Sequence, residues 1–217
     1  MPKVTFEFNA KKEYDFINFF EKNLYKLNLP KNLRSNWKNK KEAIKLIEAV
    51  YKKERKKEYE NNWKPIEKDY FDLVEKITNH KWLHKNYRVV ITKYMLGFAN
   101  PFDINTNKVT CRQNYKKIER NYIIAHELFH LHYHKIISKK NNPALFNSEL
   151  NENCVILTLC FSEIKNLLVE PKNEWIIKEW INSHPDAAKY FKKLLPLWKN
   201  RKNFDDYLKK SLSVLKK

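Results

Sequence analysis

The sequence predicts an α+β fold that is predominantly helical, with a small β-sheet packed on one histidine-bearing helix and helical extensions at both ends. Three observations predict it. Apolar residues recur at helical spacing through most of the 217-residue chain. Two short runs rich in β-branched and aromatic residues interrupt this pattern near the middle. A single glycine, Gly97, leaves the turns to Asn, Asp and Pro, and it excludes the glycine-rich phosphate loops of nucleotide-binding proteins.

The region 1–80 is predicted to be helical, with one short strand at its start. The stretch VTFEF, residues 4–8, alternates apolar and polar side chains, as a strand does. Three amphipathic helices are expected from Lys11 onward, because apolar residues recur there every three or four positions. Ser35 is a suitable cap for the second of these helices, and Pro65 suits the first turn of the third.

The region 81–170 is predicted to form the core of the fold. YRVVITKYML at 87–96 and KVTCRQ at 108–113 are the two predicted strands. Helices are then expected at about 116–138, 147–168 and 173–183. The region 171–217 is predicted as a basic helical extension with breaks at Pro185 and Pro196. The alternative is that all three regions form one compact domain.

The formal charge of +19 comes from 44 basic and 25 acidic residues, and most of the excess is lysine. We interpret it as a solvated surface, and the alternative is a nucleic-acid-binding face. Three cysteines without a C-x-x-C pair, and an N-terminus without an apolar segment, suggest a cytoplasmic protein in reducing surroundings. No apolar run approaches the length of a membrane span, so no membrane partner is expected.

One stretch, AHELFHLHYHK at 125–135, holds four histidines and a glutamate. His126 and His130 lie about 40° apart around a helix axis, one turn above the other, so their imidazoles can converge on one ion. Glu127 lies beside them, where it can reach a water molecule on the metal without coordinating the metal itself. This is the H-E-x-x-H arrangement of zincin-like cores. The histidine face is predicted to line a cleft, because the opposite face is apolar, with Ile124, Leu128 and Leu131.

A zinc ion at this motif needs a third protein ligand. His134 follows on the same face, but it lies about 12 Å from His126 along the helix axis, too far for one tetrahedral site. The metzincin solution is excluded, because Tyr133 and Ile136 occupy the positions of its glycine and third histidine. His134 is therefore expected to be satisfied elsewhere or to face solvent, and His132 is interpreted as a surface residue or a support for a ligand.

A carboxylate from the following helix remains as the third ligand. In NSELNENCVILTLC, Glu149 and Asn153 are four residues apart and share one helix face. We expect Glu149 to bind the metal and Asn153 to accept a hydrogen bond from a ligand histidine, which fixes its tautomer. Glu152 is the alternative ligand. These ligand types predict one Zn²⁺ per chain.

The two motifs together resemble those of the ImmA/IrrE metallopeptidases, a family of small gluzincins. AHELFHLHYH is similar to the first family motif, with His134 at its final histidine, and ELNENCVILTLCFS is similar to the second. The resemblance covers about residues 87–162, and it places Glu149 at the metal-binding glutamate and Asn153 at the asparagine of the second motif. The departures from the family pattern are Phe129, Glu152 and Ser162. The resemblance implies a zinc peptidase with a protein or peptide substrate, and in known members this is a helix-turn-helix repressor.

The mechanism expected of such a site uses Glu127 as general base, and Tyr133 and His134 are the candidate donors to the developing oxyanion. The peptide is expected to lie along KVTCRQ as an edge strand. Two alternatives stay open: a non-catalytic, metal-containing binding protein, and a nucleic-acid-associated protein that acts through its basic helices. A SprT-like protease would need a third histidine, and His184 in NSHPDAA is the distant candidate, in a context that does not fit that family.

Overall fold

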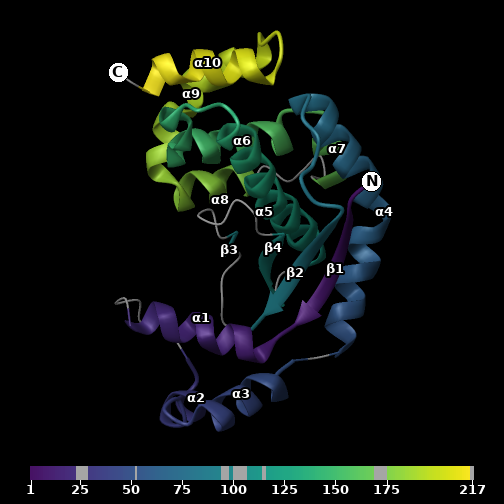
Figure 1. Ribbon diagram of the computed structural model, residues 1–217, viewed down its shortest axis with the longest axis vertical. Helices are drawn as coiled ribbons and strands as arrows, with labels where there is room; N and C mark the ends of the chain where they lie inside the picture. Colours follow the sequence, from purple (N-terminus) through teal and green to yellow (C-terminus); the bar gives the residue numbers. More distant parts are fainter. Residues whose placement is uncertain are drawn as a thin grey trace.

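The computed structural model describes residues 1–22, 29–51, 53–93, 98–99, 107–113, 116–168 and 175–215. Helices dominate it, and they surround one small sheet (Figure 1). The predicted α+β, predominantly helical class is therefore confirmed. In chain order the elements are β1 (Lys3–Phe8), α1 (Ala10–Lys22), α2 (Lys31–Ser35), α3 (Lys40–Ala49), α4 (Lys53–Thr78), β2 (Asn86–Thr92), β3 (Phe98–Ala99), β4 (Lys108–Arg112), α5 (Lys117–Ser138), the 3₁₀ helix η1 (Pro143–Phe146), α6 (Ser148–Cys160), α7 (Lys165–Leu168), α8 (Trp175–Ser183), α9 (Pro185–Lys199) and α10 (Phe204–Leu215).

The sheet has the strand order β1-β2-β4-β3, and the three predicted strands are all present in it. β1, β2 and β4 are parallel, whereas the two-residue β3 runs antiparallel to β4. The predicted strand at 87–96 corresponds to β2, and its residues 94–96 lie outside the described part of the chain. Helix α5, which carries the histidine motif, packs against β4 and β3.

The expectation that KVTCRQ forms an edge strand is wrong. β4 pairs with β2 on one side, and on the other side Val109 and Thr110 pair with β3. A peptide could add to this sheet beside β3 instead, because that strand is last in the order of the described strands. The strands at 87–96 and 108–113 could each be recognised in the sequence, but their order within the sheet depends on pairing with other parts of the chain.

Two hydrophobic clusters hold the molecule together. The larger one joins the sheet, α4, α5, α6 and the C-terminal helices, and its buried members include Phe6, Trp63, Leu128 and Trp198. A smaller one joins α1, α2 and α3 at the lower end of Figure 1, around Ile17, Leu33 and Ile47. β1 and α4 thus share a core with the regions predicted as 81–170 and 171–217, and only α1 to α3 have a core of their own.

Two prolines predicted at helix boundaries lie inside helices instead. Pro65 lies within α4 and Pro196 within α9. An internal proline removes a backbone hydrogen bond, but tertiary packing can outweigh that loss. Two fully buried tryptophans, Trp63 and Trp198, lie two residues from these prolines and anchor both helices in the core. Pro185 occupies the first turn of α9, as its fixed backbone angle favours.

The remaining helix boundaries differ from the prediction in two places. The predicted helix starting near Ser35 is divided, because α2 ends at Ser35 and the next helices are α3 and α4. The cap of α3 is Asn39, whose side chain accepts a hydrogen bond from the backbone N–H of Glu42 at 3.2 Å. The predicted helix at 147–168 is divided into α6 and α7.

The Tyr70 hydroxyl fixes α5 directly before the histidine motif. It is fully buried on α4 and donates a 2.7 Å hydrogen bond to the carbonyl oxygen of Ala125. We expect Tyr70→Phe to lower the free energy of unfolding by about 1 kcal/mol, the typical net contribution of such a bond. Urea denaturation would measure the change, with Tyr190→Phe on the half-buried face of α9 as the control. Equal stability of both variants and wild type would contradict this role of Tyr70.

Candidate metal centre

The central turns of α5 place two imidazoles side by side. Nε2 of His126 and Nε2 of His130 are 2.9 Å apart, as the i, i+4 spacing predicts. The helix begins with a local cap, in which the Glu119 carboxylate accepts a 2.7 Å hydrogen bond from the backbone N–H of Lys116. From Ile124 to His134 every residue of α5 is buried, so the helix crosses the interior and its histidine face meets α6. His126 and His130 are only 8% and 7% exposed, so little of either ring is open to solvent.

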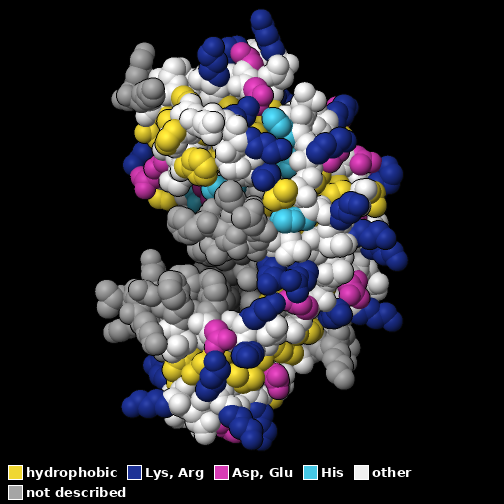
Figure 2. Space-filling model, in the orientation of Figure 1, with side chains coloured by type: hydrophobic (Ala, Val, Ile, Leu, Met, Phe, Trp, Pro, Cys, Tyr) yellow, Lys and Arg dark blue, Asp and Glu magenta, His cyan; other side chains and the backbone are white. Residues whose placement is uncertain are grey.

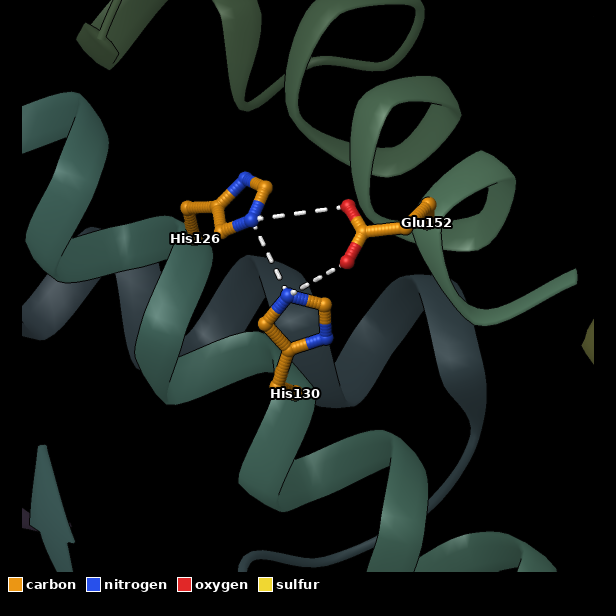
Figure 3. A group of neighbouring side chains, drawn as sticks. All are labelled: His126, His130 and Glu152. Atoms are coloured by element: carbon orange, nitrogen blue, oxygen red, sulfur yellow. Dashed lines mark hydrogen bonds and ion pairs between the residues drawn. The ribbon is translucent and has the colours of Figure 1, made fainter. Parts of the chain in front are cut away.

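Glu152 on α6 points at the two imidazoles and completes a three-residue cluster (Figure 3). Its Oε1 lies 3.4 Å from Nε2 of His130, and its Oε2 lies 3.7 Å from Nε2 of His126. Metal–ligand bonds of about 2.0–2.1 Å in a tetrahedral zinc site separate the ligand atoms by roughly 3.3 Å. The observed separations lie around that value, so these three side chains can hold one metal ion.

A second observation supports the fit of this cluster to a cation. Oε2 of Glu152 and Nδ1 of His126 are both buried, and neither has a hydrogen-bond partner among the described residues. A buried carboxylate oxygen that faces imidazole nitrogens needs a positive charge to offset its desolvation. A metal ion held by the cluster would supply that charge, and two imidazole nitrogens with one carboxylate are a donor set that zinc accepts.

The expected ligand Glu149 is not part of the cluster, and Glu152 takes its place. The Glu149 carboxylate instead accepts a 3.1 Å hydrogen bond from the Ser148 hydroxyl, and it acts electrostatically on Lys189 of α9. Glu149 and Glu152 are three residues apart on one helix, a difference of about 60° around the axis. The rotation of α6 turns Glu152 toward α5 and Glu149 toward α9.

The same rotation exchanges the supporting asparagine. Oδ1 of Asn151 lies 3.0 Å from Nδ1 of His130, whereas Asn153 donates to the backbone carbonyls of Glu149 and Ala187, both at 2.8 Å. Since a carboxamide oxygen only accepts, Nδ1 of His130 carries the proton and Nε2 presents its lone pair to the cluster. Asn151, which was not among the predicted residues, therefore makes the histidine contact that was expected of Asn153. The feature of the sequence that could have indicated Asn151 was its position directly before Glu152.

We expect Asn151→Ala to lower zinc affinity by about 10–100-fold, the usual effect of losing a group that orients a ligand histidine. The histidine ring would lose the acceptor that fixes its tautomer, while all three cluster side chains remain. Competition titration with a chromophoric chelator would measure the affinity. Asn121→Ala, on the same helix as the histidines but beyond the cluster, is the control, and an equal affinity of both variants would contradict this function of Asn151.

Burial favours the neutral form of His126 and of His134. It holds the pKa of His126 well below its usual range, and the neighbouring His130 and His184 act in the same direction. Burial also lowers the pKa of His134 to about 4, with a further contribution from His130. Nε2 of His134 accepts a 3.2 Å hydrogen bond from the Asn151 amide. His134 is thus satisfied within the protein, one of the two expected outcomes, and it lies outside the cluster.

Two other residues near the motif do not lie where the sequence suggested. Tyr133 is fully buried, and its hydroxyl donates a 2.8 Å hydrogen bond to the carbonyl oxygen of Leu145, so it faces the core instead of the metal cluster. His132 is 2% exposed and is not a surface residue. It lies 2.9 Å from the Thr78 hydroxyl and packs on the Trp82 ring, on the side of α5 that meets α4.

Glu127, the expected general base, is buried on α5 at 7% exposure. Burial raises the pKa of the Cys111 thiol on β4 to about 12, and the Glu127 carboxylate contributes in the same direction. Burial likewise raises the pKa of Tyr122, to which Glu127 and Glu152 both contribute. The carboxylate of Glu127 thus acts electrostatically on one side chain of β4 and one in the first turns of α5.

His184, set aside on sequence grounds, lies beside the cluster. It is the single residue between α8 and α9, and its Nε2 is 3.4 Å from Oε2 of Glu152. Its ring is also 6.4 Å from that of His126, measured between centroids. The available signal in the sequence was a histidine immediately before a helix-starting proline, which does not by itself indicate a contact with Glu152, 32 residues back along the chain.

The chain matches no family model, no curated protein and no solved structure. The described residues include no helix with the length and apolar character needed to cross a membrane. The class of site is thus defined by geometry alone: a buried cluster of two histidines and one glutamate that could hold a metal ion.

Proposed function

We propose that the protein is a zinc-dependent metallopeptidase with a zincin-like core, similar to the ImmA/IrrE gluzincins. The convergence of His126, His130 and Glu152 on one point carries the proposal. Three features accompany it: the H-E-x-x-H spacing, a ligand-bearing helix that follows the motif, and a sheet packed on the motif helix. A bound zinc ion supplies Lewis acidity and activates water for attack on a carbonyl group.

The residues of the chain have distinct functions in this proposal. His126, His130 and Glu152 hold the metal, and Asn151 fixes the His130 ring so that its Nε2 lone pair is available. Glu127 receives the proton of the attacking water and passes it to the leaving amine. The substrate is a peptide or a protein segment, and a helix-turn-helix repressor is the target class that the family resemblance suggests.

Hydrolysis of an unfolded protein substrate tests the proposal. We expect purified protein with one equivalent of zinc to cleave denatured casein or a mixed peptide library, and cleavage to stop after removal of the metal with 1,10-phenanthroline. Readdition of zinc should restore it, which separates metal loss from unfolding. Zinc binding without cleavage of any substrate, including repressor-like helical peptides, would remove the peptidase function and leave the metal site.

The second candidate function is a non-catalytic, metal-containing binding protein. The low exposure of both histidines favours it, because a structural metal site is typically closed to solvent. A nucleic-acid partner is part of this alternative, although lysine and arginine side chains are scattered over the face seen in Figure 2 and do not form one continuous patch. Zinc that raises the melting temperature without supporting hydrolysis would favour this function, as would a steep salt dependence of DNA binding.

A further inference from the structure

We propose that the outer side of α2 and α3 binds the phosphate backbone of duplex DNA. Five exposed cationic side chains form this contact, which we call the α2–α3 surface: Lys31, Arg34, Lys38, Lys41 and Lys45. The stretch KNLRSNWKNKK, residues 31–41, contains five basic residues and no acidic one. Contacts between such side chains and phosphates supply the sequence-independent part of DNA affinity. The inference does not depend on the metal site.

The packing of α3 directs its lysines to solvent. Ala43 and Ile47 are fully buried in the small core that α3 shares with α1. Lys41 and Lys45 each lie two residues from Ala43, about 200° around the helix axis, so both point away from that core. In Figure 1, α2 and α3 lie at the end of the molecule opposite α10, and Lys and Arg side chains project from this end in Figure 2. A duplex can therefore approach them from outside.

The cations of the α2–α3 surface have no counter-charge within the described part of the chain. No carboxylate there lies within ion-pair distance of any of the five, including Glu42 and Glu48 of α3 itself. Helix α4 differs, because a carboxylate oxygen lies within 3.7 Å of each of four of its cations: Arg55, Lys56, Lys68 and Lys76. Like charges one helical turn apart, such as Lys41 and Lys45, destabilise a helix. An anionic partner removes this repulsion.

Neutral hydrogen-bond donors lie among these cations. Asn32 and Asn39 are exposed, and their side-chain oxygens accept from the backbone N–H groups of Leu33 and Glu42 at 2.9 and 3.2 Å. Their NH₂ groups make no hydrogen bond among the described residues. Lysine, arginine and asparagine side chains are groups that commonly contact phosphate oxygens. The α2–α3 surface thus combines charge with donors that can position a backbone.

The α2–α3 surface suits DNA better than a membrane or an apolar protein partner. A helix that lies on a membrane needs an exposed apolar face, and the centres of protein interfaces are poor in lysine. None of the exposed large apolar side chains among the described residues lies on α1, α2 or α3; they are Met1, Leu83, Phe146 and Ile181. Duplex DNA carries about one negative charge per 1.7 Å of its axis, so cations about 6 Å apart along α3 can each meet a phosphate.

A salt titration of DNA binding tests the inference. Fluorescence anisotropy would measure the affinity of the full-length, metal-free protein for a short labelled duplex of mixed sequence at several salt concentrations. We expect the triple variant Lys38→Gln, Lys41→Gln, Lys45→Gln to bind more weakly than wild type. The slope of log affinity against log salt should fall in magnitude by about 2.7, since each lost phosphate contact removes about 0.9.

A triple variant of α9 is the matched control: Lys192→Gln, Lys193→Gln, Lys199→Gln. These three lysines are also exposed, and the substitutions remove the same charge from one other helix. We expect this variant to keep the wild-type slope. An equal loss in both triple variants would overturn the inference, because binding would then follow the net charge of +19 and not the α2–α3 surface.

Two further results would overturn the inference. One is wild-type protein without salt-dependent DNA binding. The other is competition by polyglutamate or by anionic vesicles that matches competition by unlabelled DNA at equal charge, which would assign the α2–α3 surface to an acidic protein or a membrane. Circular dichroism would show whether the variants fold. The double variant Lys41→Gln, Lys45→Gln, with an expected slope change of about 1.8, gives the same comparison if the triple variant does not fold.

Discussion

Replacing Glu152 with alanine is expected to lower zinc affinity by more than about 100-fold, beyond the range that loss of a supporting residue causes. The carboxylate is the only acidic group in the cluster, and both of its oxygens face ligand nitrogens within 3.7 Å. Without it, two neutral imidazoles remain, a weaker site for a divalent cation than two imidazoles and a carboxylate. Elemental analysis of the purified variants, followed by competition titration, would measure the loss.

Glu149→Ala is the matched control for this experiment, because both glutamates are half-buried on the same helix. We expect it to keep one zinc per chain with wild-type affinity. The opposite result, zinc lost with Glu149→Ala and kept with Glu152→Ala, would mean that α6 is rotated relative to the arrangement described. Circular dichroism of both metal-free variants would show whether the helix content is preserved, so that metal loss is not confused with unfolding.

The histidine pair could be predicted from sequence because it depends on a single helix. The i, i+4 spacing fixes the relation of His126 to His130 whatever surrounds them, and the structure has their Nε2 atoms 2.9 Å apart. The strands were equally local, since β-branched runs stand out in a lysine-rich, helix-forming chain. The order of the strands in the sheet does not depend on local sequence, and for this reason the edge position predicted for β4 was wrong.

The third member of the cluster could not be chosen from sequence, because it depends on how α6 is rotated. Usually an apolar stripe sets that rotation, but α6 is buried on all sides from Asn153 to Cys160, so its sequence has no distinct polar face. Glu149 with Asn153 and Glu152 with Asn151 were both compatible with a His₂Glu site. Contacts with α9, such as that of Asn153 with Ala187, select the second pair, and α9 is remote in sequence.

Tyr133 illustrates the same difference between position and orientation. It lies next to His134 and three residues after His130, so spacing alone placed it near the metal face. In the fold its hydroxyl is directed into the core, where Leu145 of η1 accepts its hydrogen bond. A large aromatic side chain is drawn to the more apolar surroundings, and a buried hydroxyl then needs a partner there.

Glu127→Gln is expected to lower peptide hydrolysis by about 10²–10⁴-fold, the usual contribution of a general base, while one zinc per chain stays bound. The substitution keeps the size of the side chain and removes its ability to accept a proton. Glu127 does not belong to the cluster of side chains that can hold the ion, so metal content should be unaffected. Parallel measurement of zinc content and of the rate of cleavage therefore separates proton transfer from metal binding.

Glu119→Gln provides the control on the same helix. Glu119 caps the start of α5 through the backbone N–H of Lys116, and a glutamine oxygen can accept that hydrogen bond equally well. We expect this variant to keep both zinc and activity. Wild-type cleavage by Glu127→Gln would remove Glu127 from proton transfer, and loss of zinc in that variant would mean that its carboxylate holds the metal. Loss of cleavage with zinc retained, in Glu127→Gln alone, is the result that a metallopeptidase requires.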